Sequence, residues 1–174
     1  YKEITLLGQN VNAYGKDFKD LNYTFANLLE DLHKTDIKRI RYTTSHPRDL
    51  DDATIDAMAL GGNIMPHLHL PVQSGSDTVL KKMNRKYTKE EYMDKINKLK
   101  TKIPNISLTT DIIVAFPGES EEDFQKTIEL VSIKKKEKNT IFNVKRIKNE
   151  RTATDYSTST YYKTEKDNSI VMLH

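Results

Sequence analysis

The fold class follows from the stretch ISLTTDIIVA at residues 106–115, which leads into Phe116-Pro117-Gly118-Glu119. Its last four residues are all apolar, and such a continuous run is typical of a strand buried on both faces of a parallel sheet. A helical pattern follows, because Ser120 stands three residues before Asp123 and apolar residues then recur at helical spacing as far as Val131. A buried strand, a short turn and an amphipathic helix together make one βα unit.

The same alternation of strand and helix patterns extends back to the start of the chain. β-favouring runs occupy residues 4–7, 39–44 and 67–72. Three further segments have helical patterns. The first is residues 23–33, and the second can be capped by Asp49 and ends at Gly61-Gly62. The third begins at the capping-box pair Thr88 and Glu91. We therefore expect an α/β fold with parallel strands and about four βα units, arranged as an open curved sheet or as part of a barrel. Four units leave a bare edge at each end, which suggests neighbouring strands outside this sequence.

The composition restricts the kinds of site that the chain can hold. Its 174 residues suffice for one domain with a hydrophobic core, and none of them is cysteine. Without thiolates the chain cannot form disulfides, thiolate zinc sites or an iron–sulfur cluster on cysteines of its own. No apolar run reaches the roughly 18 residues of a membrane span and no signal-peptide pattern is present, so we expect a cytoplasmic protein without a membrane partner. The start at Tyr1, with no initiator Met, suggests a piece of a longer protein.

Residues 132–174 differ in composition from the rest. They hold ten Lys or Arg against five Asp or Glu, whereas residues 1–131 hold 18 against 20. All six Gly and all five Pro lie within residues 1–131. We therefore divide the chain into a (βα) core at 1–131 and a basic, Lys-, Asn- and Thr-rich tail at 132–174, which we expect to be poorly ordered or foreign to the core. Within the tail, Ile141, Val144 and Ile147 have the spacing of one short amphipathic helix.

Polar residues gather where the predicted strands end. In parallel α/β folds, ligands bind at this carboxyl edge of the sheet. The segments there are rich in amides and hydroxyls, include one His and carry few charges, so they suit a neutral ligand with many hydrogen-bonding groups. They are residues 8–15, 43–47, 71–76 and 116–119.

Several of these residues also have a structural interpretation. The amides of Gln9, Asn10 and Asn12 are suited to bonding turn backbone as well as a ligand. His46, directly before Pro47, is as well suited to a structural hydrogen bond as to catalysis. Both interpretations remain open at these positions.

Three further features call for a choice between interpretations. His67 and His69 share one face of a strand, as metal ligands can, but we favour packing there because a buried sheet offers little room. The Ser74-Gly75-Ser76 segment resembles a phosphate-binding loop but lacks the Lys and the full spacing of one. Asp111 lies inside the buried strand, where a carboxylate needs a partner, and stands close enough to the strand's end to reach the polar edge.

Five segments resemble the methylthiotransferase family of radical S-adenosylmethionine enzymes, and they occur in the family's order. The resemblance covers residues 1–131. The Gly-Gln-Asn and Thr-Ser-His-Pro strings within the first two segments resemble the branch of the family that modifies isopentenyladenosine in tRNA. The ribosomal-protein branch and the threonylcarbamoyladenosine branch carry different residues at both places. The five segments are residues 8–15, 43–47, 69–76, 83–88 and 110–119.

The resemblance implies a partial TIM-like (βα) barrel in a tRNA-modifying enzyme, which transfers a methylthio group to C2 of N6-isopentenyladenosine near the anticodon. It implies S-adenosylmethionine, two [4Fe–4S] clusters, tRNA, and a reducing partner such as flavodoxin or ferredoxin. The cluster ligands are not in this chain, so we expect the chain alone to be inactive and assign it no catalytic residue and no metal ligand.

The resemblance also implies where the cofactor binds. Gln9 and Asn10 are expected near the methionine end of S-adenosylmethionine, Gln73 and Ser74 near its ribose, and residues 114–117 near its adenine. The complete expected cofactor-binding set is Gln9, Asn10, Ser45, His46, Gln73, Ser74, Asp111, Val114 and Pro117.

The sequence departs from the family pattern in three ways. The Cys-x-x-x-Cys-x-x-Cys loop is absent, Ala115 stands where the family usually has Gly, and the family's next strand does not follow Val131. A frameshift in an A-rich gene would explain residues 132–174, and an intact reading frame through them would rule it out. Two other functions remain open: a cluster-free α/β module that binds RNA or a nucleotide, and an unrelated α/β enzyme with Asp111 and His46 as acid and base.

Overall fold

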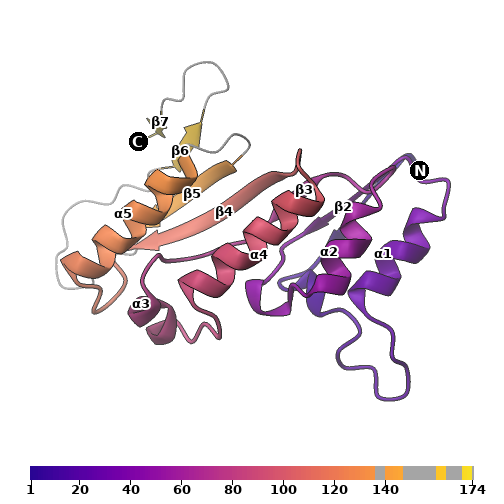
Figure 1. The fold of residues 1–174 in the computed structure, drawn as a ribbon, viewed down its shortest axis with the longest axis horizontal. Coiled ribbons are helices and arrows are strands. Elements are labelled where there is room, and N and C mark those ends of the chain that lie inside the picture. Colours follow the sequence, from indigo (N-terminus) through magenta and orange to yellow (C-terminus); the bar gives the residue numbers. More distant parts are fainter. Residues whose placement is uncertain (136–139, 147–159, 164–169, 174) are drawn as a thin grey trace. The chain divides into compact units, whose positions relative to one another are not determined.

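The computed structural model describes residues 1–135, 140–146, 160–163 and 170–173. The chain forms two compact units, one of Tyr1–Leu70 with Met93–Leu108, and one of Pro71–Tyr92 with Thr109–His174. Figure 1 labels the helices and strands of both units. The strands are β1 (Glu3–Leu7), β2 (Arg39–Thr43), β3 (His67–His69), β4 (Ser107–Val114), β5 (Thr140–Arg146), β6 (Thr160–Lys163) and β7 (Ile170–Leu173). The α-helices are α1 (Phe25–His33), α2 (Asp52–Ala59), α3 (Asp77–Lys82), α4 (Lys89–Lys102) and α5 (Glu121–Lys135), and Val11–Ala13 and Pro47–Asp49 form short 3-10 helices.

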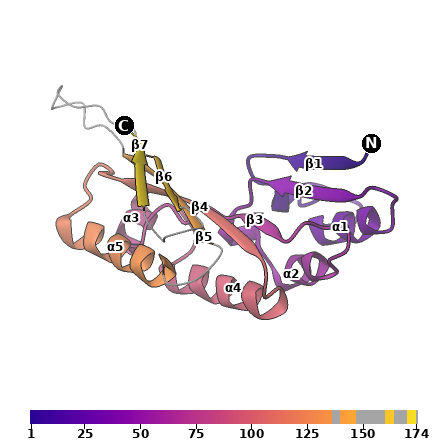
Figure 2. The same ribbon diagram turned by 90° about the horizontal axis from the view of Figure 1, so that it is seen from above.

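The first unit is built on a parallel strand pair. β1 and β2 pair in register from Glu3 opposite Arg39 to Leu7 opposite Thr43, and their arrows point the same way in Figure 2. Burial alternates along β2, where Ile40 is fully buried and the two arginines beside it are exposed. Alternation of this kind means that one face of the pair packs on the core and the other does not.

Helices α1 and α2 supply the core of the first unit. They contact each other along their lengths, as Figure 1 shows. The ring of Phe25 at the start of α1 meets that of Tyr42 on β2 edge-on, with the centroids 5.7 Å apart. Phe25, Leu29 and Ile55 are each at most 2% exposed. Burial of such side chains stabilises a fold by roughly 1.5–3 kcal/mol each.

The start of α2 corrects one prediction from the sequence. Asp51, not Asp49, caps this helix, because its Oδ1 accepts a hydrogen bond from the backbone N–H of Thr54 at 2.8 Å. Asp49 lies in the preceding 3-10 helix and is buried. Both residues are good helix caps, so spacing from the apolar residues did not separate them.

The second unit contains most of β4, the strand that decided the fold class, from Thr109 onward, together with α3, α5 and β5. Its two predicted helix starts are confirmed. Thr88 and Glu91 each accept a hydrogen bond from the other's backbone N–H, at 3.2 and 2.8 Å, before α4. Ser120 and Asp123 do the same before α5, at 3.1 and 3.2 Å.

The amphipathic helix predicted from Ile141, Val144 and Ile147 is wrong. Residues 140–146 form the strand β5 instead, while Ile147 lies outside the described residues. Three apolar residues at one spacing give a weak helical signal, and Thr140, Ile141, Phe142 and Val144 are all β-favouring types. The helix α5 continues past Val131 to Lys135, and β6 and β7 form an antiparallel pair. The other residues of the predicted tail are not described, so the division at residue 131 remains a prediction.

The predicted α/β class with parallel strands is confirmed. Besides the β1–β2 pair, isolated parallel bridges join Ile40 to Ile64 in the first unit and Gln73 to Ile112 in the second. Within the described ranges the strands do not close into a barrel, which fits a partial one. Among the same residues, no helix is long and apolar enough to cross a bilayer.

Candidate functional site

The loop after β1 is bonded to the segment after β2. The backbone N–H of Gly8 donates to the Thr43 oxygen at 2.9 Å, and that of Thr44 donates to the Gly8 oxygen at 2.8 Å. Val11 N then donates to the Thr44 oxygen at 2.9 Å. The two carboxyl ends of the strands are therefore held together, as expected for neighbouring parallel strands.

Asn12 and His46 connect the two segments a second time. The side chain of Asn12 donates to the His46 oxygen at 3.1 Å and accepts from the His46 backbone N–H at 2.8 Å. The Nδ1 atom of His46 accepts from the backbone N–H of Arg48 at 3.1 Å, so the imidazole caps the following 3-10 helix. Asn12 and His46 thus have structural roles here, and the buried Ser45 bonds the His69 oxygen through its backbone N–H at 3.2 Å.

A buried carboxylate lies under this loop, and sequence reasoning missed its role. Asp49 has a side chain only 2% exposed, yet it pairs with Lys16 and with Arg48, whose Nη2 is 2.8 Å from Oδ2. The side-chain amide of Asn10 also donates to Oδ2, at 2.5 Å. Burial by itself raises the pKa of Asp49, but the hydrogen bonds from Arg48, Lys16 and Asn10 hold that pKa well below its ordinary value. Asp49 is thus a fixed anion that orients the Asn10 amide.

The orientation of Asn10 leaves one polar atom unused. Its amide nitrogen faces Asp49, while its carbonyl oxygen Oδ1 is buried and has no hydrogen-bond partner within the part of the chain described. An unpaired buried acceptor costs roughly 1–3 kcal/mol. The Asn10 oxygen is therefore a preoriented acceptor for a donor that is not among the described residues. The neighbouring residue Gln9 is exposed.

In the second unit, Gln73 has an unusual backbone conformation. It is not a glycine, yet its φ is +72°, and its side chain is almost fully buried. Two backbone hydrogen bonds fix it beside β4: Gln73 N donates to the Asp111 oxygen at 2.9 Å, and Ile113 N donates to the Gln73 oxygen at 2.8 Å. A left-handed backbone at a non-glycine residue costs about 1–3 kcal/mol and is common at ligand sites.

The Ser74-Gly75-Ser76 segment packs against α5 rather than standing open. The Ser74 hydroxyl is fully buried 3.3 Å from that of Thr127, and Gly75 N donates to the same Thr127 hydroxyl at 3.0 Å. Ser76 donates to Asp123 Oδ1 at 2.5 Å. Hydrogen bonds from the side chains of Ser76 and Ser120 and from the Ser120 backbone lower the pKa of Asp123 to about 2. These contacts anchor the segment that carries Gln73.

The loop after β4 contains the remaining residues of the predicted site. Asp111 and Val114 are half-buried and Pro117 is exposed. Glu119, absent from the predicted set, accepts from Phe116 N at 3.2 Å through Oε2, while its Oε1 is buried without a hydrogen-bond partner among the described residues. A second unpaired acceptor therefore lies at this strand end. In the sequence, Glu119 was marked only by its position three residues after Phe116, from whose backbone N–H it accepts a hydrogen bond.

Ala115 adopts a left-handed backbone with φ of +57°. A side chain in this region costs roughly 1–2 kcal/mol, and glycine avoids that cost. This explains in physical terms why glycine suits the position.

Replacing Ala115 with glycine is expected to raise the free energy of unfolding by about 0.5–1 kcal/mol, after the extra unfolded-state entropy of glycine is subtracted. Ala115 is exposed, so no packing is lost. Urea unfolding followed by circular dichroism measures the change. The control is Ala53→Gly in α2, which should lower the same free energy by up to about 1 kcal/mol. A lower stability for Ala115→Gly would contradict this account of the backbone.

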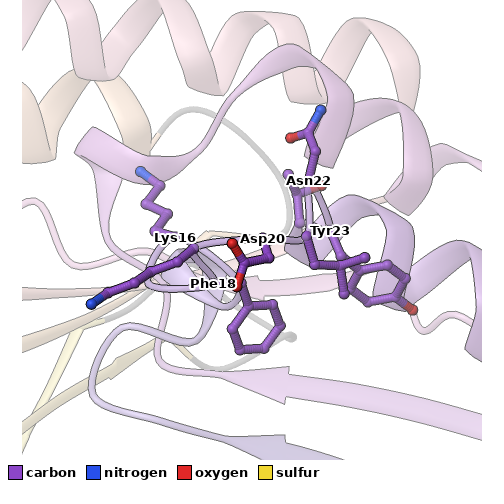
Figure 3. Close-up of a pocket in the computed structure, with 9 residues that line it drawn as sticks. Lys16, Phe18, Asp20, Asn22 and Tyr23 are labelled. Atoms are coloured by element: carbon purple, nitrogen blue, oxygen red, sulfur yellow. The ribbon is translucent and has the colours of Figure 1, made fainter.

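One pocket of about 550 Å³ lies within the loop between β1 and α1. Figure 3 shows Lys16, Phe18, Asp20, Asn22 and Tyr23 around it, all from this loop. The Tyr23 hydroxyl donates to Asp31 at 2.8 Å, which raises the pKa of Tyr23 to about 12. The pocket is open and contains none of the residues predicted from the sequence, so we assign it no ligand.

The predicted set thus divides between the two units. The first holds Gln9, Asn10, Ser45 and His46, and the second holds Gln73, Ser74, Asp111, Val114 and Pro117. In the described ranges, no group of three or more His, Asp or Glu side chains is arranged to hold a metal ion. Whether these residues bind a cofactor remains a prediction.

Comparison with known proteins assigns the family. Residues 1–131 match the Radical SAM superfamily. The chain belongs to this superfamily. The radical SAM segment is 61% identical over 131 residues to the tRNA-2-methylthio-N(6)-dimethylallyladenosine synthase of Oceanobacillus iheyensis, a match to 75% of this chain and 25% of that protein. It is 62% identical over 130 residues to the proteins of that name from Staphylococcus haemolyticus and Bacillus subtilis, covering 25% and 26% of them. The chain therefore spans about a quarter of the length of these relatives.

The radical SAM assignment can be tested against the residues present. S-adenosylmethionine carries an ammonium group, two ribose hydroxyls and an adenine amine, all donors, and the unpaired oxygens of Asn10 and Glu119 are acceptors at two strand ends. Each of these oxygens, taken by itself, suits a hydrogen-bond donor of this cofactor. A [4Fe–4S] cluster needs thiolate ligands, and the chain has no cysteine, so its own residues do not fit a cluster.

Proposed function

We propose that this chain is the S-adenosylmethionine-binding part of an enzyme that transfers a methylthio group to C2 of N6-isopentenyladenosine in tRNA. The identity of 61% over 131 residues to a tRNA-2-methylthio-N(6)-dimethylallyladenosine synthase supports this proposal. The partners of the whole enzyme would be tRNA and a reducing protein such as flavodoxin or ferredoxin. Its place of action would be the cytoplasm.

We assign the chain's residues to positioning rather than to bond-breaking. S-adenosylmethionine supplies the radical chemistry when it is bound, and a protein orients and shields such a group. Asn10, held by the Asp49 anion, would accept a hydrogen bond from the cofactor's ammonium group, with Gln9 beside it. His46 would fix this loop through its two bonds with the Asn12 side chain, and Ser45 would fix the segment after β2 through its bond to the His69 oxygen.

The second unit would bind the nucleoside end of the cofactor. Gln73, fixed at a left-handed φ, would direct its amide toward the ribose, and Ser74 would hold that backbone through Thr127. Val114 and Pro117 would border the adenine. Asp111 would support Gln73 through its backbone oxygen, which accepts the Gln73 N–H.

A chimera tests the proposed function. Residues 1–130 of this chain would replace the matching 130 residues of the Bacillus subtilis relative. In cells that lack their own enzyme, this chimera is expected to restore the 2-methylthio nucleoside, measured by mass spectrometry of digested tRNA. A chimera that folds and carries its clusters but leaves the nucleoside unmethylthiolated would refute the proposal.

The same chimera tests the site residues. Gln73→Ala and Asn10→Ala are each expected to weaken S-adenosylmethionine binding about tenfold, since each removes one buried hydrogen bond. Isothermal titration measures the affinity, and the melting temperature monitors folding. Gln125→Ala is the matched control, because Gln125 is an exposed amide on α5 that donates to Glu121 at 2.7 Å. Unchanged affinity in both variants would remove the site assignment and leave the family assignment standing.

A further inference from the structure

The face of β1 and β2 that points away from the core carries a charged cluster that the proposed site does not use. Glu3 on β1 stands opposite Arg39 on β2, and Arg41 follows two residues later on the same face. All three are exposed, whereas Ile40 between the arginines is fully buried in the core. The pleat of the strand therefore places both guanidinium groups on one side of the sheet.

Glu3 holds each of the two guanidinium groups at its Nε atom. Its Oε2 pairs with Arg39 Nε and its Oε1 accepts from Arg41 Nε at 3.0 Å, and this pairing lowers the pKa of Glu3. In the described part of the chain, the terminal Nη groups of the two arginines make no hydrogen bond or ion pair. Each arginine is thus held at its inner nitrogen and presents its outer N–H groups on a face that the described residues leave uncovered.

Two histidines extend the cluster onto β3. His67 and His69 flank the buried Leu68, so they lie on the face of β3 opposite the core. Burial lowers the pKa of His67, and the charges of His69 and Arg41 lower it further, which places His67 near both. With two arginines against one glutamate, the cluster has an excess of positive charge even while both imidazoles are neutral.

We propose that this face binds a backbone phosphate of the RNA substrate through the Nη groups of Arg39 and Arg41. Phosphate oxygens match the paired N–H groups of a guanidinium, and Arg forms such bonds in preference to Lys where the geometry is fixed. Prior orientation by Glu3 reduces the entropy that the arginines lose on binding. The proposal rests on the proposed function, because that function makes the anion a phosphodiester of RNA.

The simplest competing explanation is a solvent-facing ion pair without a ligand. Such pairs contribute little to stability at the surface. The two explanations differ in what removal of the arginines does. If the cluster is only an ion pair, removing the arginines changes the stability of the fold slightly and leaves the affinity for RNA unchanged. If it is a phosphate site, removing them changes both the affinity for RNA and the dependence of that affinity on salt.

The test uses the full 174-residue chain and a fluorescein-labelled 17-nucleotide anticodon stem-loop RNA, with affinity measured by anisotropy from 50 to 200 mM salt. Arg39→Gln with Arg41→Gln is expected to weaken binding roughly tenfold. The slope of log affinity against log salt should become shallower by about 0.7, the value for one phosphate contact on a single strand.

The control is Lys98→Gln with Lys102→Gln. This pair lies on α4 in the same unit, forms ion pairs with Asp52 and Asp56, and removes the same charge. An equal loss of affinity in both double variants would overturn the proposal, because charge alone would then account for binding. Absence of RNA binding by the wild-type chain, or binding of inorganic phosphate alone in a manner that depends on the arginines, would overturn the assignment to RNA. Neither result bears on the methylthiolation assay of the chimera, so the two proposals fail separately.

Discussion

Gly75→Ala is expected to lower the free energy of unfolding by about 3 kcal/mol, the upper part of the range for adding a methyl group to a tightly packed site. A Cβ atom at this position would stand 2.5 Å from the Lys126 oxygen and 2.7 Å from the Thr127 Cα atom. Both are backbone atoms of α5, which cannot rotate away as a side-chain end would. The methyl group would also strain the 3.0 Å hydrogen bond from Gly75 N to the Thr127 hydroxyl.

Urea unfolding of the chain, followed by circular dichroism, measures the loss. Gly8→Ala is the control, because a Cβ there meets its nearest atoms at 3.4 to 3.6 Å and Gly8 has no left-handed φ. That change should stay within about 0.5 kcal/mol. If the two variants were equally stable, the close packing of the Gln73 segment on α5 would not hold.

The architecture could be predicted from the sequence because its signals are local. The run at residues 106–115 and the Thr88 and Ser120 helix starts depend only on neighbours in the chain, and the structure reproduces each of them. The tail strand β5 was missed since it has no Gly or Pro boundary and only a short apolar pattern. Asp49 was misassigned because a cap and a buried anion have the same residue type, and only contacts from Lys16 and Asn10 distinguish them.

The sequence predicted which residues form the candidate site, but not the contacts that they make. That polar residues follow each strand is a local pattern, so Asn10 and Gln73 could be named. The hydrogen bonding and backbone conformation of these two residues could not be predicted. The orientation that leaves the Asn10 oxygen unpaired depends on Asp49, which lies 39 residues away in the chain. The left-handed φ of Gln73 likewise depends on its bridge to β4. The contact of the Ser74 hydroxyl with that of Thr127 could not be predicted either, because Thr127 lies 53 residues further along the chain.

Asp49→Asn is expected to lower the free energy of unfolding by about 2 kcal/mol. The substitution keeps the shape but removes the charge that Lys16 and Arg48 neutralise, and hydrogen bonds to a charged group contribute about 1.5–3 kcal/mol. Those partners are half exposed and regain water when the anion is lost, so the larger cost of a buried unpaired charge does not apply. The control is Asp52→Asn, the same change in a carboxylate that is 69% exposed and paired with Lys98. An exposed pair of this kind should contribute about 0.5 kcal/mol.

The difference between wild type and Asp49→Asn should also depend on pH. Because the pKa of Asp49 in the folded protein lies below its unfolded value of about 3.9, the carboxylate stabilises the fold above that pH. This contribution declines as the pH falls toward the folded pKa, since the protonated acid then resembles the amide. Unfolding measured at pH 7 and at pH 3 should therefore show a smaller gap between the two proteins at pH 3. Asp123 also has a lowered pKa. Both proteins should therefore lose some free energy of unfolding at low pH, and this common loss cancels in the difference between them. A gap that stayed constant or widened toward low pH would mean that Asp49 is not held as an anion, and Asn10 would lose the partner that orients it.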